Sequence, residues 1–340
     1  MLDTASSQAA GSAPAANAVK TLTDLVKADM EAVNVCLLDR MQSDVPMIPE
    51  LAGYLIAAGG KRIRPLLTLA SARLCGYEGE GHVQFAACVE FIHTATLLHD
   101  DVVDESDMRR GQETANRVWS NQASVLVGDF LYSRSFQLMV EQDSMECLRI
   151  LADASAIIAS GEVLQLSIQN DLGAGEDAYM KVIQAKTAEL FAAACEVGGA
   201  VHEAPAEQQA ALRAYGDNLG IAFQLIDDAL DYKADEATLG KTVGDDFAEG
   251  KITLPVLIAY EAGNAEEREF WTRTIERREQ NDGDLGTAQR LIAQHDTIGQ
   301  TVKRAQEFGQ KAKDALSIFP ASALRQAMLD VVDFSISRGH

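Results

Sequence analysis

Cysteine, proline and aromatic residues are scarce in this sequence, and positive charges are far fewer than negative ones. The cysteines are odd in number, widely spaced and without a Cys-x-x-Cys pair, which excludes a zinc site or a disulfide framework and indicates a reduced compartment. They are Cys36, Cys75, Cys88, Cys147 and Cys195. No apolar run approaches the roughly 20 residues of a membrane span. The formal net charge of −22 argues against a nucleic-acid surface. We expect a cytoplasmic protein with no membrane span and no nucleic-acid partner.

Ala, Leu, Gln and Glu are abundant instead, a composition that favours helices over strands. From Thr21 onward, apolar residues mostly recur at helical spacing, and no convincing strand-like alternation is found. Breaks include Asp235–Gly250, and a second polar stretch runs from Ala262 to Gly286. Residues 1–18 are an Ala/Ser/Gly/Pro mixture without the features of a signal peptide, so we expect a disordered tail. Because no long linker divides the rest, residues 19–340 are predicted to form a single all-helical domain, a bundle of roughly ten or more helices.

Two expected helices are apolar nearly all the way round and then end in the same acidic pattern. One runs roughly over Gln84–Asp104 and ends in HDDVVD, and the other runs roughly over Ala214–Tyr232 and ends in IDDALDY. A helix that is apolar on all sides is typical of the interior of a bundle. We therefore predict two central helices that each carry a DDxxD motif, with a cavity between them.

The aspartates of each motif need a counter-charge. Positions i and i+4 lie one turn apart on one helix face, so each motif presents three carboxylates over one arc. Like charges at this spacing repel, and acidic groups near a helix C-terminus face the negative end of its dipole. Oxygen ligands suit Mg²⁺ or Ca²⁺, and Mg²⁺ commonly shares its shell with substrate phosphates. The candidate metal ligands are Asp100, Asp101, Asp104, Asp227, Asp228 and Asp231.

A single DDxxD motif in a strongly acidic chain is more often a solvated surface, but two copies after apolar helices favour a site for metal and phosphate. Basic residues agree, although any one surface cation more often has no ligand. The motif GGKRIRP (Gly59–Pro65) combines three cations with glycines that leave backbone N–H groups accessible, and Arg binds phosphate in bidentate fashion. Further candidate phosphate contacts are Arg109, Arg110, Lys186, Thr187, Lys241 and Lys251.

Six motifs occur in the order typical of the trans-type polyprenyl diphosphate synthases, and the chain resembles that family from about Leu51 to Leu257. They are GGKRIRP, HDDVVDESDMRRG, GDFLYSRSF, KTAELF, FQLIDDALDY and GKTVGDDFAEGKITLP, and no motif position departs from the family pattern. The resemblance implies a helical bundle of the isoprenoid synthase type and a homodimer. It also implies a prenyl transferase that condenses isopentenyl diphosphate with an allylic diphosphate, such as geranyl or farnesyl diphosphate.

The resemblance further implies a role for each matching residue. The six aspartates would hold two or three Mg²⁺ ions against the allylic diphosphate. Contacts to that diphosphate would come from Arg109, Lys186, Thr187, Gln224, Lys241 and Lys251. Contacts to isopentenyl diphosphate would come from Lys61, Arg64, His93 and Arg110, although His93 taken alone resembles a core histidine. The residues expected to act in catalysis are Asp100, Asp101, Asp104, Arg109, Lys186, Asp227 and Asp228.

The length of the product is expected to depend on Ala95 and Thr96, which lie about one turn before Asp100. The resemblance leads us to expect a bulky aromatic residue there in short-chain relatives. Both side chains are small here, so we expect a product of about eight to ten isoprene units (C40–C50), although close packing between helices would also select Ala. Products of this length serve as quinone side chains.

Several alternatives stay open. A shorter-chain synthase would make C15–C20 products. A class I terpene cyclase shares the first motif but usually carries an Asn/Ser/Glu pattern in place of the second. A non-catalytic subunit of a heteromeric synthase generally lacks the aspartates, all of which are present here. An acidic protein that only stores metal would leave Lys61, Arg64, Arg109 and Arg110 unexplained.

Overall fold

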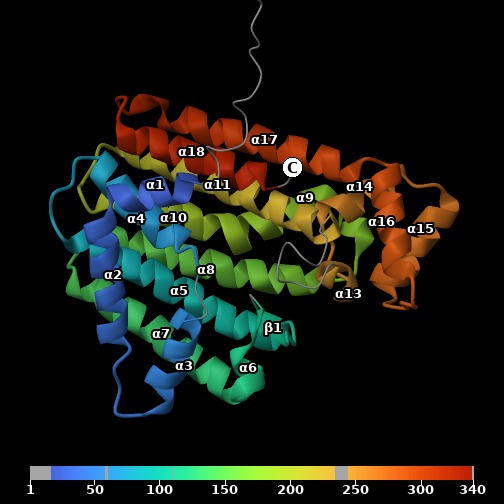
Figure 1. The fold of residues 1–340 in the computed structure, drawn as a ribbon, viewed down its shortest axis with the longest axis horizontal. Helices are drawn as coiled ribbons and strands as arrows, with labels where there is room; N and C mark the ends of the chain where they lie inside the picture. Colours follow the sequence, from blue (N-terminus) through green and yellow to red (C-terminus); the bar gives the residue numbers. More distant parts are fainter. Residues whose placement is uncertain (1–16, 58–59, 110, 234–243, 339–340) are drawn as a thin grey trace, which may run out of the picture.

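The computed structural model describes residues 17–57, 60–109, 111–233 and 244–338. Over these residues the chain forms helices that pack side by side, and the only sheet is an antiparallel hairpin of two-residue strands (Figure 1). The prediction of an all-helical bundle is therefore confirmed. None of the described helices is both long and apolar enough to cross a bilayer.

The elements follow one another through short connections. The first part of the chain forms α1 (Ala18–Leu25), α2 (Lys27–Arg40), α3 (Met47–Ala57), α4 (Ile63–Leu74), α5 (Gly81–Val103), β1 (Met108–Arg109), β2 (Gln112–Glu113), α6 (Ala115–Val118), α7 (Asn121–Glu141) and α8 (Met145–Ser167). The second part forms η2 (Leu172–Ala174), α9 (Gly175–Ile183), η3 (Gln184–Ala188), α10 (Glu189–Ala200), α11 (Ala206–Lys233), α13 (Asp245–Ala248), α14 (Leu254–Ala262), α15 (Ala265–Trp271), η4 (Thr272–Glu276), α16 (Asp284–Gln294), α17 (Thr297–Ala315), η5 (Leu316–Ile318) and α18 (Ala323–Ser337). Of the η segments, η3 and η4 are π-helical and the other two are 3-10 turns.

Helix α5 is buried because other helices cover most of its circumference. It packs against α2, α4, α7 and α10, and its buried side chains include Phe85, Phe91, Ile92 and Leu98. Helix α10 is buried along its whole length, between α4, α8 and α11. The prediction that the first DDxxD motif follows an interior helix is confirmed.

Two glycines let α11 approach its neighbours closely. A Cβ atom built on Gly216 would lie 2.3 Å from the backbone O of Phe191, and one built on Gly220 would lie 2.5 Å from the Cα of Ala188. Any larger residue would therefore push α11 away from α10 and η3. This close approach places the second DDxxD motif beside η3.

The helix bounds differ from the sequence expectation in a few places. Helix α11 begins at Ala206, eight residues earlier than expected, because its first turns are polar and show no apolar periodicity. The polar stretch Ala262–Gly286 contains α15, which begins with a capping box made by Asn264 and Glu267. The hairpin β1–β2 was not predicted, since two-residue strands are too short to show alternation. Of the expected tail, only residues 17 and 18 are described, and the latter already belongs to α1.

Candidate active site

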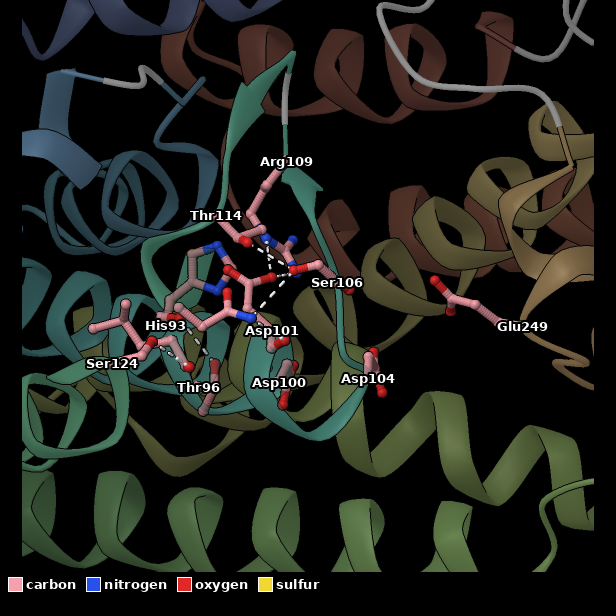
Figure 2. Close-up of polar contacts among 12 residues, drawn as sticks. His93, Thr96, Asp100, Asp101, Asp104, Ser106, Arg109, Thr114, Ser124 and Glu249 are labelled. Atoms are coloured by element: carbon pink, nitrogen blue, oxygen red, sulfur yellow. Dashed lines mark hydrogen bonds and ion pairs between the residues drawn. The ribbon is translucent and has the colours of Figure 1, made fainter. Parts of the chain in front are cut away.

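The first aspartate motif lies at the C-terminal end of α5, where Asp104 caps the helix. Asp101 is buried, with 1% of its surface exposed, and Arg109 of β1 donates from Nε to its Oδ1 at 2.7 Å (Figure 2). The backbone O of Asp101 accepts hydrogen bonds from the backbone N of Ser106 and from the side chain of Asn116. Asp101 therefore fastens the hairpin to the end of α5.

The other two aspartates of this motif face lysines from distant parts of the chain. The Nζ of Lys186, on η3, lies 3.8 Å from Oδ2 of Asp100. The Nζ of Lys251, in the segment after α13, lies 3.6 Å from Oδ2 of Asp104. Figure 2 shows the Asp101 side chain turned toward Arg109, with Asp100 and Asp104 apart from that arginine. Each carboxylate of the first motif thus has its own cation.

Burial alters the acidity of these carboxyl groups. It raises the pKa of Asp100 to about 7, helped by the nearby charges of Glu162 and Asp104 and opposed by Lys186. Burial also raises the pKa of Asp101, although its contact with Arg109 acts in the opposite direction. A carboxyl group with a pKa near 7 is only partly ionised at neutral pH, and a divalent cation that binds the ionised form would compensate the buried negative charge.

The second motif lies near the end of α11 and is held by hydrogen bonds. Asp228 is buried, and its two oxygens accept from the hydroxyl of Tyr179 at 2.5 Å and from Nε2 of Gln224 at 2.7 Å. The hydroxyl of Thr187 in turn donates to Oε1 of Gln224 at 2.9 Å. Burial, together with the charge of Asp246, raises the pKa of Asp228 to about 7. Asp228 therefore orients Gln224 and Tyr179 within the site.

Two segments connect the motifs. The π-helix η3 presents Lys186 toward Asp100 and the next residue, Thr187, toward Gln224 on α11. Near the end of α11, Asp231 accepts a hydrogen bond from the backbone N of Asp246 on α13 at 3.1 Å, and Asp246 lies 3.9 Å from Lys251. Insertions of π-helix into longer helices are frequent at functional sites. The predicted pairing of the two DDxxD motifs in one site agrees with these contacts.

Three cations near the start of α4 and the end of α18 rest on aromatic rings. Lys61 lies 4.8 Å from the ring centre of Phe334, and Arg64 lies 4.3 Å from that of Phe191. Arg338 lies 4.5 Å from the ring centre of Phe223, and this ring is 5.6 Å from the Phe191 ring. Such rings attract cations through their electron-rich faces, so they help to hold these three side chains in place.

Electrostatic contacts tie this cationic group to both halves of the site. Burial lowers the pKa of Lys61, and the neighbouring Arg338 lowers it further while Asp227 of the second motif raises it. One Nη of Arg64 lies 3.3 Å from Nε2 of His93. Lys61 thus interacts with Asp227, and Arg64 lies beside His93. The assignment of Lys61, Arg64 and His93 to isopentenyl diphosphate stays a prediction.

The remaining predicted residues have different outcomes. Arg110 and Lys241 lie outside the described residues. Ala95 is fully buried in the core on α5, and the hydroxyl of Thr96, one residue further, donates to the backbone O of His93 at 2.8 Å. The role of Ala95 and Thr96 in product length stays a prediction.

Five residues of the site were not identified from the sequence. Asp246 and Glu249 lie inside a motif that was noticed, but the acidic residues of that motif were not assigned a role. Glu162 and Tyr179 lie on helices and Arg338 directly follows α18, and no local pattern distinguishes them from ordinary residues of such segments. The structure places all five beside the predicted site, through the contacts Lys186–Glu162, Tyr179–Asp228, Asp231–Asp246, Lys251–Glu249 and Arg338–Phe223.

The donor set fits a hard divalent cation that shares its shell with a ligand. All donors are carboxylate oxygens, which suit Mg²⁺ and Ca²⁺. Within the described part of the chain, no group of three or more His, Cys, Asp or Glu residues is arranged to hold a metal by itself. Mg²⁺ commonly takes only one or two carboxylates and completes its shell with phosphate oxygens and water. The residues therefore fit a cation that binds together with a diphosphate.

Comparison with known proteins supports the same interpretation. A family model described as polyprenyl synthetase matches residues 45–292. The octaprenyl diphosphate synthase of Haemophilus influenzae is 46% identical over 95% of this chain and 98% of that protein.

Solved structures agree with the sequence match. The polyprenyl synthase of Caulobacter crescentus, solved with calcium and isoprenyl diphosphate, superposes with a TM-score of 0.91 at 53% identity, over 94% of this chain and 97% of that one. A decaprenyl diphosphate synthase from Rhodobacter capsulatus gives a TM-score of 0.91 at 52% identity, over 95% and 99% of the two chains. The chain therefore belongs to the polyprenyl synthetase family, whose members are prenyl transferases.

Proposed function

We propose that this protein condenses isopentenyl diphosphate with an allylic diphosphate, geranyl or farnesyl diphosphate, in a Mg²⁺-dependent reaction, and that it repeats the step to make a long all-trans polyprenyl diphosphate. The observation that carries the proposal is the position of η3 between the two DDxxD motifs. Lys186 approaches Asp100 on one side, and Thr187 contacts Gln224 on the other. A diphosphate held there meets both acidic motifs and a cation at once.

Different residues of the site would bind the two substrates. Lys186, Lys251 and Arg109 would bind the allylic diphosphate, and the cations Lys61 and Arg64 would bind isopentenyl diphosphate, with help from His93 and from Arg110. The aspartates of the two motifs would hold two or three Mg²⁺ ions, and these ions would supply positive charge to the departing diphosphate. Stabilising the developing charge of the leaving group lowers the barrier to cleavage of the allylic C–O bond.

The chain's own residues also protect the reacting carbons. The double bond of isopentenyl diphosphate attacks the allylic cation, and a proton is then lost to the released diphosphate, so no side-chain nucleophile is required. Water would consume the cation, and the apolar residues near the site, including Phe191, Phe223 and Ala95, exclude it.

The proposed product length is about C40–C50, consistent with a quinone side chain. Relatives named octaprenyl and decaprenyl diphosphate synthases support this length, as do the small side chains of Ala95 and Thr96. A shorter-chain synthase or a non-catalytic subunit would differ in the products formed, so the same experiment distinguishes them.

A homodimer is also proposed, through the outer faces of α7 and α8. On α7, Leu126 and Val140 are 66% and 65% exposed, and on α8, Val163 and Leu166 are 63% and 56% exposed. Several large apolar side chains exposed on neighbouring helices are typical of an interface between subunits. The high negative charge of the chain makes an apolar face a better contact between two copies than a charged one.

The decisive experiment is to incubate the purified protein with isopentenyl diphosphate, farnesyl diphosphate and Mg²⁺, and to measure the products by mass spectrometry. We expect polyprenyl diphosphates of about C40–C50, and no product when EDTA removes the metal. A cyclic hydrocarbon would contradict the reaction, and a C20 product alone would contradict the proposed chain length. No product from any allylic primer would favour the non-catalytic alternative.

A further inference from the structure

Each of the two lysines that face the first aspartate motif also contacts a glutamate, and the glutamate is the closer partner. The Nζ of Lys186 lies 2.8 Å from Oε2 of Glu162 on α8 but 3.8 Å from Asp100. The first distance is that of a hydrogen bond, whereas the second is a longer electrostatic contact. Glu162 therefore determines where the ammonium group of Lys186 lies.

Lys251 has the same arrangement on the other side of the motif. Its Nζ is in close contact with Glu249, the residue that caps α13, whereas Asp104 and Asp246 lie 3.6 and 3.9 Å away. Figure 2 shows the Glu249 side chain on the far side of Asp104 from Arg109, with its carboxylate turned toward the site. Two unrelated parts of the fold thus place a lysine between a glutamate and an aspartate.

The local packing holds Glu162 in place. A Cβ atom on the preceding residue, Gly161, would lie 2.6 Å from the Cβ of Ala185 on η3, so α8 touches the π-helix at this point. The side chains of Glu162 and Lys186 are 27% and 23% exposed, which makes their contact partly shielded from water. Removing one partner of a partly shielded ion pair leaves the other charge poorly compensated, whereas the loss of an exposed pair has little effect on stability.

Once a metal is present, the aspartates of the motif and the two glutamates cannot both hold the lysines. A carboxylate that binds a divalent cation has little negative charge left for a lysine, and Asp100 and Asp104 are the proposed metal ligands. A lysine held only by these aspartates would lose its anchor when the metal binds. Glu162 and Glu249 are not among the proposed metal ligands, so they remain able to hold the ammonium groups of Lys186 and Lys251.

We propose that Glu162 and Glu249 are positioning residues that hold Lys186 and Lys251 toward the allylic diphosphate while Asp100 and Asp104 bind metal. The proposal rests on the proposed function, and it assigns the two glutamates a part in binding the diphosphate without touching it. They act through the lysines, so their effect requires the lysines to be present.

A double-mutant cycle tests this requirement. We expect Glu162→Gln to raise the KM for farnesyl diphosphate by about tenfold, because it removes a charged hydrogen bond to Lys186, with a change of less than about twofold in the KM for isopentenyl diphosphate. In a Lys186→Ala background, Glu162→Gln should have no further effect. The same pattern is expected for Glu249→Gln with Lys251→Ala.

Two further variants separate positioning from general structure. Glu162→Asp keeps the charge and should recover part of the loss. Glu269→Gln is the matched control, because the exposed side chain of Glu269 on α15 makes a 2.8 Å contact with the exposed Arg277 after η4. It should leave both KM values unchanged. If Glu162→Gln lowers activity equally with and without Lys186, or behaves like Glu269→Gln, the positioning role is overturned.

Binding of inorganic diphosphate with Ca²⁺, measured by calorimetry, provides a readout without turnover. We expect Glu162→Gln and Glu249→Gln each to weaken diphosphate binding by about tenfold, and the effect to vanish when the paired lysine is absent. If the wild-type protein forms product while the cycles are additive, the positioning role alone fails. If the cycles couple but no prenyl product forms, the proposed reaction fails and the positioning role stands.

Discussion

Asp100 is largely buried, which favours its neutral form, but its proposed role as a metal ligand requires the ionised form. Burial raises its pKa to about 7, well above the ordinary value of 3.8. A group whose pKa is higher in the folded than in the unfolded state stabilises the fold at low pH, and this contribution is lost as the pH rises through the folded value. The metal-free protein therefore carries an unfavourable carboxylate at pH 8.

We expect Asp100→Asn to remove this penalty while it abolishes activity. We compare the free energy of unfolding of the variant with that of the wild type in EDTA, by urea denaturation. The difference should shift in favour of the variant by about 2 kcal/mol as the pH rises from 5 to 8. Turnover with Mg²⁺ should fall by about a hundredfold or more, since a proposed metal ligand is lost. A stability difference that does not change with pH would contradict the assigned cause.

The division of the cations between two substrates predicts opposite kinetic effects. Arg64→Ala should mainly raise the KM for isopentenyl diphosphate, because Arg64 lies beside His93, which is proposed to bind that substrate, and over the ring of Phe191. Lys186→Ala should mainly raise the KM for the allylic substrate, because Lys186 faces Asp100. Each change is expected to be about tenfold or more, and steady-state kinetics with either substrate varied will measure it. Equal losses for both substrates in both variants would refute the assignment.

At the scale of elements, α5 carries both the first aspartate motif and the proposed determinant of chain length. Ala95 is completely buried on this helix, so a larger side chain there must displace its neighbours. We expect Ala95→Phe to shorten the products to about fifteen to twenty carbons and to cost about 1–3 kcal/mol of stability through overpacking. Mass analysis of the products measures the first effect, and Ala95→Ser, which adds no ring, is the control. Full-length product from the Phe variant would show that the chain does not pass Ala95.

The contact between α11 and η3 allows a second test at this scale. Gly220→Ala would place a Cβ atom 2.5 Å from the Cα of Ala188, so α11 must move away from η3. We expect a loss of about 1–3 kcal/mol in stability and a lower kcat, because the contact between Thr187 and Gln224 lengthens. Gly286→Ala on α16 is the control, since its Cβ would meet nothing within 4 Å, and it should be neutral or stabilising by up to about 1 kcal/mol. Equal melting temperatures for the two variants would contradict this explanation.

At the scale of the whole molecule, the proposed dimer requires the apolar faces of α7 and α8 to be covered. Leu126→Glu would place a charge in an interface between two strongly acidic chains, so we expect it to shift the protein from dimer to monomer. Light scattering after size-exclusion chromatography measures the mass, which should halve. Lys20→Glu, on the exposed surface of α1, also introduces a negative side chain and changes the net charge by two units instead of one, and it should leave the dimer intact. A wild-type protein that is already monomeric would refute the proposed dimer.

Much of the fold and site was predictable because the informative residues are local in sequence. A buried helix must be apolar on most of its circumference, and α5 showed this pattern directly. The DDxxD spacing follows from the helical repeat, so the candidate metal ligands could be named before any fold was known. Helix ends were less predictable, as α11 shows, because polar first turns carry no periodic signal.

The sequence by itself determined the helical class, the two acidic motifs and the cations in the same motifs, because periodicity and spacing act within a few turns of one chain segment. Only the tertiary structure decided which cation meets which carboxylate. Arg109 lies near Asp101 in sequence, but Lys186 and Lys251 reach Asp100 and Asp104 from segments far along the chain. The same holds for Glu162, which has no local pattern of its own. Its role depends on the packing of α8 against η3, and such contacts are set by the whole bundle.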